Sequence, residues 1–255
     1  MTEPKHPLTL AVDIGGTGIK ATVLDAAGEM VTERERVETT YPMPPDQLVG
    51  IINEMVKQLP ASDRGSAGFP GMVRNGRVLT APMFSTAHGP GTPVEAKLVE
   101  AWYDFDLAAV LSRAIGIPFR VANDADVQGS AVVAGKGVEM VITLGTGFGT
   151  ALFEEGRLLP HLEIAHHPLR QDETYNEYVG EAARKLVGTK RWNRRVRRAI
   201  GQLEALVFYD HLYVGGGNAK RIEGSLGENV TIIDNRAGLL GGIALWERTA
   251  HLDAP

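Results

Sequence analysis

Asp13-Ile14-Gly15-Gly16-Thr17-Gly18 ends one predicted strand and leads through a tight turn into a second strand that contains Lys20. The arrangement recurs 130 residues later, where Val141-Ile142-Thr143-Leu144 enters Gly145-Thr146-Gly147-Phe148-Gly149. Glycines at a strand-to-strand turn let backbone N–H groups approach an anion without a side chain in the way. Two such turns in two halves of one chain predict a clamp for a phosphate-bearing molecule.

A single turn of this kind is weak evidence, because a hairpin can need glycine for its backbone alone. Neither a Walker A spacing nor a GxGxxG fingerprint is present. The functional interpretation has backbone N–H groups and Thr17 hold phosphate, with Asp13 near a Mg²⁺ ion through water. The second copy of the turn favours this interpretation.

The composition is that of a soluble globular protein, with 44% hydrophobic and 22% charged residues among 255. No apolar run approaches the roughly 20 residues that span a bilayer, and Met1–His6 has no apolar signal-peptide core. We therefore expect a cytoplasmic location and no membrane partner. The absence of cysteine excludes disulfides, thiolate zinc sites and cysteine nucleophiles.

The net charge of −5 conceals a local basic segment. Residues 184–198 contain eight arginines and lysines and no acid, whereas the rest of the chain carries 18 basic and 31 acidic residues. A positive patch on an acidic body indicates a specific anionic partner rather than general nucleic-acid binding.

The order of apolar and turn segments predicts an α/β protein, because strands are linked both by hairpins and by helices. The first half predicts a meander over 8–37, a helix over 48–59, strands at 66–71 and from 76, a loop over 82–93, a helix over 107–115 and a strand over 119–122. The second half predicts a helix from about 125, a meander over 138–160, a basic helical region, a strand at 212–214 and a helix over 237–247.

We place a domain boundary near residue 121, which gives an N-terminal lobe of residues 1–121 and a C-terminal lobe of residues 122–255. The last helix is expected to pack back on the N-terminal lobe.

Asn123-Asp124-Ala125-Asp126 follows a predicted strand and opens a helix. One interpretation is that Asn123 or Asp124 caps that helix. The other makes Asp124 a general base aimed at a substrate hydroxyl, kept ionised by the helix N-terminus. The residues alone leave these two interpretations level.

Two further segments carry candidate binding residues. Glu163 and His166, in Glu163-Ile164-Ala165-His166-His167, could bind adjacent sugar hydroxyls, because a diol offers donors and acceptors in a fixed fan; a surface histidine pair is the alternative. Gly215-Gly216-Gly217-Asn218 could hold a nucleotide against bare backbone, or could be a turn in which Asn218 caps the next helix.

The basic segment is an amphipathic helix, because Val196, Ala199, Leu203 and Leu206 form one apolar stripe from Trp192. A solvated basic face is the ordinary interpretation. Guanidinium groups also suit phosphate oxygens, which makes a polyphosphate track an equal alternative. The residues of that track are Lys190, Arg191, Arg194, Arg195 and Arg198.

Taken together, these motifs resemble the ROK family of sugar kinases, in its polyphosphate-dependent glucokinase branch. The carriers are Asp13–Thr17, Gly68–Gly71, Asn123–Asp126, Leu144–Gly149, Glu163–His166 and Tyr213–Asn218, with Trp192–Val196 typical of the branch. The resemblance implies a two-lobed actin/hexokinase-like (ribonuclease H-like) fold with a central cleft, and a homodimer. It also implies Mg²⁺ with ATP or polyphosphate as the cofactor and donor.

By that resemblance Asp124 is the catalytic base, and the sugar is held by Gly71, Asn123, Glu163 and His166. The phosphate or nucleotide set is Asp13, Gly15, Gly16, Thr17, Lys20, Gly145, Thr146, Gly147, Gly215, Gly216 and Gly217. Two departures from the family pattern are Ala165, where the Glu-x-Gly-His motif has glycine, and Met83, where many relatives have asparagine.

The expected activity is transfer of a terminal phosphoryl group from polyphosphate, ATP or both to the 6-hydroxyl of glucose or a close hexose. One alternative is an ATP-only ROK kinase. The other is a non-catalytic sugar-binding regulator, disfavoured because the first strand begins near Leu8 and leaves no room for the DNA-binding domain of ROK repressors.

Overall fold

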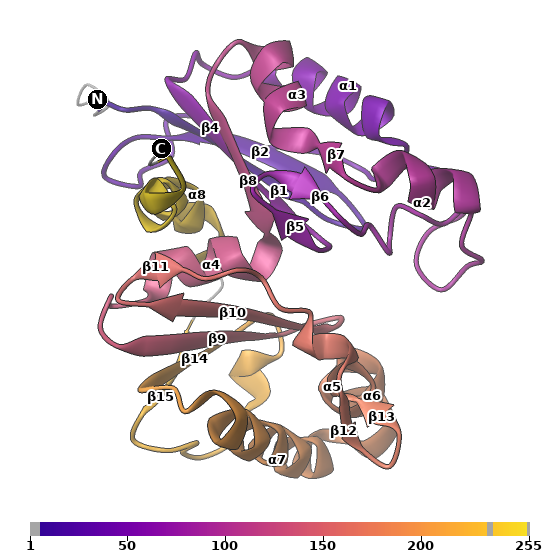
Figure 1. Cartoon of the computed structure of the whole chain (residues 1–255), viewed down its shortest axis with the longest axis vertical. Helices are drawn as coiled ribbons and strands as arrows, with labels where there is room; N and C mark the ends of the chain where they lie inside the picture. The colour runs from indigo at the N-terminus through magenta and orange to yellow at the C-terminus, as the bar shows by residue number, and fades with distance from the viewer. Residues whose placement is uncertain (1–5, 234–236, 254–255) are drawn as a thin grey trace. The chain divides into compact units, whose positions relative to one another are not determined.

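A computed structural model describes residues 6–233 and 237–253 of the chain, and its contacts divide the protein into two units (Figure 1). The first unit contains residues up to Ala131 together with those from Gly238 onward, and the second contains Val132–Ala237. Both units combine a sheet with helices, and the predicted α/β class is confirmed. The division lies after residue 131, whereas the sequence placed a boundary near residue 121.

The first unit is built on a five-stranded sheet of order β3-β2-β1-β4-β8. Its strands are β1 Thr9–Ile14, β2 Ile19–Leu24, β3 Glu35–Val37, β4 Arg64–Phe69 and β8 Phe119–Asn123. The first three strands are antiparallel, as the meander predicted, while β4 and β8 run parallel to β1. The register pairs Asp13 with Lys20 on one side and with Gly68 on the other.

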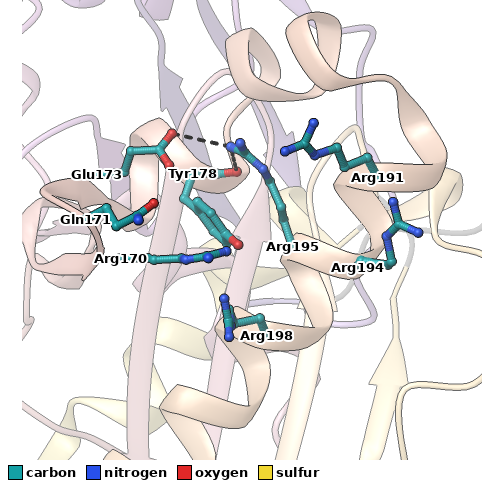
Figure 2. A pocket seen from close by; sticks show the side chains of 8 residues that line it. All are labelled: Arg170, Gln171, Glu173, Tyr178, Arg191, Arg194, Arg195 and Arg198. Carbon is teal, nitrogen blue, oxygen red and sulfur yellow. Dashed lines mark hydrogen bonds and ion pairs between the residues drawn. The ribbon is translucent and has the colours of Figure 1, made fainter.

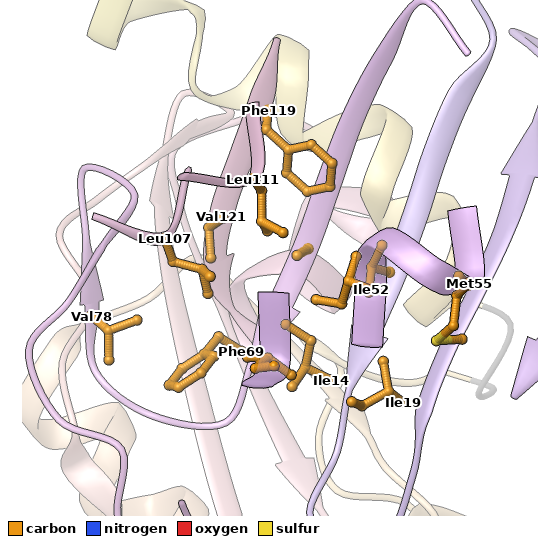
Figure 3. Packing of buried hydrophobic residues seen from close by; sticks show 14 of the residues in the cluster. Ile14, Ile19, Ile52, Met55, Phe69, Val78, Leu107, Leu111, Phe119 and Val121 are labelled. Carbon is orange, nitrogen blue, oxygen red and sulfur yellow. The ribbon is translucent and has the colours of Figure 1, made fainter. Parts of the chain in front are cut away.

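Helices α1 (Pro45–Val56) and α3 (Leu107–Ile115) cover one face of this sheet (Figure 1). Pro45 stands at the first turn of α1, where its missing N–H is no loss. Asp106 caps α3 through Ala109 N, and Gly116 ends it with a φ of +83°. Figure 3 shows the apolar side chains of strands and helices that fill the space between them.

Helix α8 (Ala237–Arg248) packs on the other face of the first sheet. Ser66 Oγ donates to Gly242 O at 2.7 Å, and the Arg120 guanidinium stacks on the Trp246 ring at 4.3 Å. Helix α4 (Asp124–Val132) follows β8 directly. The other elements of this unit are β5 Val73–Arg74, β6 Arg77–Val78, α2 Ala96–Trp102, β7 Phe105–Asp106 and η3 Ala250–Asp253.

The second unit repeats the plan with a sheet of order β11-β10-β9-β14-β15. Its strands are β9 Val138–Leu144, β10 Phe148–Glu154, β11 Arg157–Leu158, β14 His211–Gly215 and β15 Val230–Ile232. The pair β9–β10 is antiparallel, whereas β14 is parallel to both β9 and β15. The sequence did not predict β15.

The helices of the second unit are α5 Tyr175–Val179, α6 Glu181–Val187 and α7 Thr189–Val207, with short turns η1 Ile164–His166 and η2 Ala219–Arg221. A small hairpin, β12 Pro168–Arg170 with β13 Glu173–Thr174, precedes α5. Helix α7 is the predicted basic helix, and Val196, Ala199 and Leu203 are buried against the sheet. The prediction for Leu206 was wrong, since it is 60% exposed. At about 100° per residue, Val207 continues the buried face instead.

None of the helices within residues 6–233 and 237–253 combines the length and the hydropathy that crossing a bilayer requires.

A buried carboxylate organises the loop before β9. Glu139 is 1% exposed and accepts hydrogen bonds from the backbone N–H groups of Ala134, Gly135 and Lys136 at 2.6, 2.6 and 3.1 Å. The Tyr213 hydroxyl donates to it at 3.0 Å. Because a buried charge must be hydrogen-bonded, these four donors are what allow Glu139 to occupy the interior.

We expect Glu139→Ala to lower the free energy of unfolding by about 3 kcal/mol, because it leaves three loop N–H groups without their acceptor. Urea denaturation measures the change. Glu154→Ala is the matched control, since Glu154 is an exposed carboxylate on the neighbouring strand β10, and its effect should stay within about 0.5 kcal/mol. Equal losses for the two variants would contradict the role given to Glu139.

Candidate functional site

The first glycine turn is a tight hairpin between β1 and β2 that is held from outside. Gly15 N donates to Gly18 O at 3.1 Å. Thr39 Oγ1 donates to Gly15 O at 2.6 Å, and the Tyr41 hydroxyl donates to Gly16 O at 2.7 Å. A Cβ on Gly16 would lie 2.3 Å from the Met83 terminal methyl, so a larger residue there would displace the end of the Met83 side chain.

Asp13, near the end of β1, forms an ion pair with Lys20 of the neighbouring strand β2. Lys20 Nζ donates to Asp13 Oδ2 at 2.8 Å, and the Asp13 side chain is 50% exposed. The remaining Asp13 oxygen has no protein donor in the described part of the chain, so it could accept from a metal-bound water.

Asn123 and Gly71, both predicted to bind sugar, lie together in the first unit. Asn123 Nδ2 donates to Gly71 O at 3.0 Å. A Cβ on Gly71 would lie 2.2 Å from Thr80 O, so only glycine fits this position. The Asn123 amide is therefore fixed by backbone of the loop that follows β4.

Asp124 is the first residue of α4 and is exposed, whereas Asn123 before it is buried. Ala125 N donates to both Asn123 Oδ1 and Asp124 Oδ1, at 2.8 and 2.9 Å. The side-chain oxygens of Asn123 and Asp124 therefore cap α4, and the Asp124 carboxylate is exposed at the surface as well. A Cβ on Gly68 would lie 3.4 Å from Asp124 Cα, which is van der Waals distance, so the start of α4 packs directly on β4.

In the second unit, the Gly145–Gly147 turn and the Gly215–Gly217 turn lie side by side. Asn218 N donates to Leu144 O at 2.8 Å, and Asn218 Nδ2 donates to Gly145 O at 3.2 Å. Gly216 has a φ of +87°, and a Cβ there would lie 2.4 Å from Leu144 O. Asn218 precedes η2, but its side chain serves the neighbouring turn rather than a helix cap.

Two short helices complete the surroundings of the second turn. Phe148 N donates to Asn176 Oδ1 of α5 at 3.0 Å, and Glu181 N of α6 donates to Thr146 O at 3.3 Å. The Phe148 ring stacks on Tyr175. Hydrogen bonds from Arg184 and Asn218 lower the pKa of Glu181 to about 2. Sequence reasoning missed Asn176 and Glu181.

Glu163 lies beside a histidine that the sequence analysis did not select. His161 Nε2 is 3.6 Å from Glu163 Oε1, and the His161 side chain is 2% exposed. The nearby His161 imidazole, with further attraction from His166, holds the pKa of Glu163 below its ordinary value. His166 is exposed at the end of η1, where His166 N donates to Glu163 O at 3.2 Å. In the sequence, the His-x-Glu spacing of His161 and Glu163 was the signal that could have indicated this pair.

A strongly basic pocket of about 370 Å³ lies in the second unit (Figure 2). Its lining comes from α7, α5 and the β12–β13 hairpin, and consists of Arg170, Gln171, Glu173, Tyr178, Arg191, Arg194, Arg195 and Arg198. Four of the five residues of the predicted polyphosphate track contribute to it, whereas Lys190 is not among the lining residues. Arg170, which adds a fifth guanidinium, was not predicted.

Some arginines of the pocket contact other protein groups, whereas others have no ion-pair partner in the part of the structure that is described and could bind a ligand. Arg195 lies 4.4 Å over the Tyr178 ring, donates to Tyr178 O at 3.2 Å and reaches Glu173 at 3.4 Å. Burial raises the pKa of the Tyr178 phenol, but hydrogen bonds from Arg170 and Arg198 outweigh it and leave the pKa below its ordinary value. By contrast, Arg191 and Arg194 are exposed and have no ion-pair partner among the residues that the structure describes.

Among residues 6–233 and 237–253, no group of three or more His, Asp or Glu side chains is arranged to hold a metal ion.

Comparison with known families identifies the chain. The model of the ROK family matches residues 9–169, which is more than half of the sequence. The protein belongs to the ROK family.

Among curated relatives, polyphosphate glucokinase of Mycobacterium tuberculosis is 27% identical over 248 residues, covering 90% of this chain and 88% of the relative. Among solved structures, the inorganic polyphosphate/ATP-glucomannokinase of Arthrobacter sp. strain KM is 27% identical with a TM-score of 0.75, covering 94% and 98% of the two chains. A ROK glucokinase from Streptomyces griseus, solved with glucose and AMPPNP, has 20% identity and a TM-score of 0.69, covering 93% and 98%; it supports the fold alone. The predicted ROK hexokinase-like fold is confirmed.

The structure shows how the two residues that depart from the ROK pattern, Ala165 and Met83, are packed. Ala165 is 8% exposed and belongs to the hydrophobic core of the second unit. Met83 lies on the first glycine turn, at the position that a Gly16 side chain would take.

Proposed function

We propose that this ROK protein is a sugar kinase that moves a terminal phosphoryl group from polyphosphate, and also from ATP, to the 6-hydroxyl of glucose or a close hexose. The observation that carries the choice of polyphosphate is the pocket with five guanidinium groups and one carboxylate. Guanidinium groups bind phosphate oxygens through paired N–H donors, and a chain of phosphates offers such oxygens repeatedly.

The acceptor side of the proposal rests on Asp124. The 6-hydroxyl oxygen attacks the terminal phosphorus, the bond from that phosphorus to its bridging oxygen breaks, and the hydroxyl proton passes to the Asp124 carboxylate. The leaving group is polyphosphate shortened by one unit, or ADP. Asp124 suits the role because it is exposed at the start of α4 while its neighbours Asn123 and Ala125 are buried.

The hexose is held in this proposal by Asn123 with Gly71 and by Glu163 with His166. The lowered pKa of Glu163 keeps it a carboxylate that accepts hydrogen bonds from sugar hydroxyls. The buried His161 imidazole lies beside it, at 3.6 Å.

The donor is held by backbone at the two glycine turns, with Gly215–Gly217 beside the second turn as the place for a nucleotide. Mg²⁺ bound with the donor would neutralise charge on the phosphates, and Asp13 could hold one of its waters through the oxygen that Lys20 leaves available. Dimerisation, which the family resemblance implies, and a cytoplasmic location, which the amino-acid composition and the lack of long apolar runs indicate, stay predictions.

A coupled assay for hexose 6-phosphate tests the proposal, with glucose and mannose as acceptors and long-chain polyphosphate or ATP as donors, each with Mg²⁺. We expect product with polyphosphate, and a steep loss of that activity as salt rises, because a polyanion in a basic pocket is screened strongly. Product with ATP alone would replace the proposal by an ATP-only kinase. Hexose binding without product from any donor would indicate a regulator.

A further inference from the structure

Two consecutive backbone carbonyl groups of the first glycine turn accept hydrogen bonds from side chains outside the turn. Gly15 O accepts from the Thr39 hydroxyl and Gly16 O from the Tyr41 hydroxyl, at 2.6 and 2.7 Å. Both donors come from the segment that follows β3, outside the hairpin itself. A turn needs no such bonds to form, since Gly15 N and Gly18 O already close it.

The restraint on the carbonyls also fixes the direction of the N–H groups. A trans peptide is planar and places its C=O and the following N–H on opposite sides. Anchoring Gly15 O therefore points Gly16 N–H away from the 39–41 segment, and anchoring Gly16 O does the same for Thr17 N–H. Neither N–H has an acceptor within residues 6–233 and 237–253.

The second glycine turn shows the same arrangement with different donors. Gly145 O accepts from Asn218 Nδ2, and Thr146 O accepts from Glu181 N. By the same peptide geometry, Thr146 N–H and Gly147 N–H point away from those donors. Because the two units obtain this pattern from a pair of hydroxyls in one case and from an amide and a backbone N–H in the other, a shared functional requirement explains it better than local packing.

We propose that Thr39 and Tyr41 are positioning residues for phosphoryl transfer, which hold the carbonyls of Gly15 and Gly16 back so that the N–H groups of Gly16 and Thr17 present a preorganised anion site. The inference rests on the proposed function. A rotated peptide would turn a carbonyl oxygen toward the donor, and its negative end would repel the charge that develops in the transition state.

The surroundings of Tyr41 favour this positioning role over a role in stabilising the fold alone. Burial raises the pKa of the Tyr41 phenol above its ordinary value, so the hydroxyl keeps its proton and stays a donor. The ring packs near Phe84, with centroids 6.3 Å apart, and Met83 covers Gly16 from the same loop. Tyr41→Phe keeps this packing and removes only the oxygen that holds Gly16 O.

The test compares Tyr41→Phe and Thr39→Val with the wild type in kcat, in KM for hexose and donor, and in thermal unfolding. We expect each variant to lose about tenfold to 10²-fold in kcat, because a misplacement near 1 Å costs that much. The KM for hexose and the unfolding temperature should stay close to wild type. Thr39→Ser, which restores the hydroxyl, should restore kcat.

Ser112→Ala is the matched control, since Ser112 Oγ donates to Ile117 O at 2.8 Å and likewise holds a backbone carbonyl of the first unit. It should leave kcat unchanged. Wild-type kcat in both Tyr41→Phe and Thr39→Val would overturn the proposal, as would a loss of kcat that Thr39→Ser fails to restore.

A binding measurement separates this inference from the proposed function. Tripolyphosphate with Mg²⁺ is titrated into the protein while the backbone amide resonances of Gly16 and Thr17 are followed by NMR. If the wild type phosphorylates no hexose but tripolyphosphate shifts both amides, and shifts them less in Tyr41→Phe, the positioning role stands and the proposed function fails. If tripolyphosphate leaves both amides unmoved in the wild type, the positioning role is wrong whatever the activity.

Discussion

Asp124→Asn should abolish turnover while hexose binding stays mostly intact. The substitution keeps the size of the side chain and an oxygen that can accept from Ala125 N, so the start of α4 keeps its cap. It removes the carboxylate that accepts the proton of the 6-hydroxyl. A general base contributes about 10²–10⁴-fold to a rate, so kcat should fall by at least that range.

Single-turnover kinetics and calorimetric titration of glucose measure the two halves of this prediction. Asp106→Asn is the matched control, because Asp106 is also a carboxylate at a helix start of the first unit, where it caps α3 through Ala109 N at 3.0 Å. That variant should keep wild-type kcat. Turnover near the wild-type level in Asp124→Asn would show that the base is assigned to the wrong residue.

Replacement of Arg191 and Arg194 together by alanine should lower kcat/KM for long-chain polyphosphate by about 10²-fold, the scale expected for losing two charge-assisted contacts. These two side chains are chosen because they line the pocket without an ion-pair partner in the described residues. Arg195 is unsuitable, since it also supports Tyr178 and Glu173. The KM for glucose should not change.

Lys190→Ala supplies the control, since Lys190 is an exposed cation on the same helix that does not line the pocket. The assay is repeated over a range of salt concentrations, and the double variant should show a shallower salt dependence than the wild type. Equal effects of Lys190→Ala and of the double variant would mean that overall charge, rather than the pocket, attracts the donor.

Elements with strong local signals could be predicted from the sequence. Helix α3 spans Leu107–Ile115, as the apolar spacing predicted. The two hairpins around Gly15 and Gly145 were predicted because glycine interrupts alternating apolar segments in a way that few other structures require. The ROK family follows from the order of these motifs rather than from any one of them.

Short elements that depend on tertiary contacts were missed. Helix α5 has five residues, too few to be stable alone, and it forms because Tyr175 and Tyr178 are buried against its neighbours. A local signal existed, since Thr174 and Glu177 form a capping box. The β12–β13 hairpin carried no such signal, so the contribution of Arg170 to the basic pocket could not be foreseen.

The division into units was also beyond local patterns. Helix α4 lies against α8 in the first unit because a glycine lets the two helices approach: a Cβ on Gly241 would lie 1.8 Å from Val127 O. Such contacts join segments far apart in the chain, and a single sequence gives no sign of them.

Helix α5, which is five residues long, is hydrogen-bonded both beside the second glycine turn and in the basic pocket. Asn176 accepts from Phe148 N beside the second glycine turn, and Tyr178 two residues later offers its carbonyl to Arg195 in the basic pocket. A displacement that moves Tyr178 and α5 as one body would therefore also move Asn176. If the proposed donor sites at the pocket and at the turn are coupled through this helix, thermodynamic reciprocity requires that their ligands alter each other's affinity by the same factor.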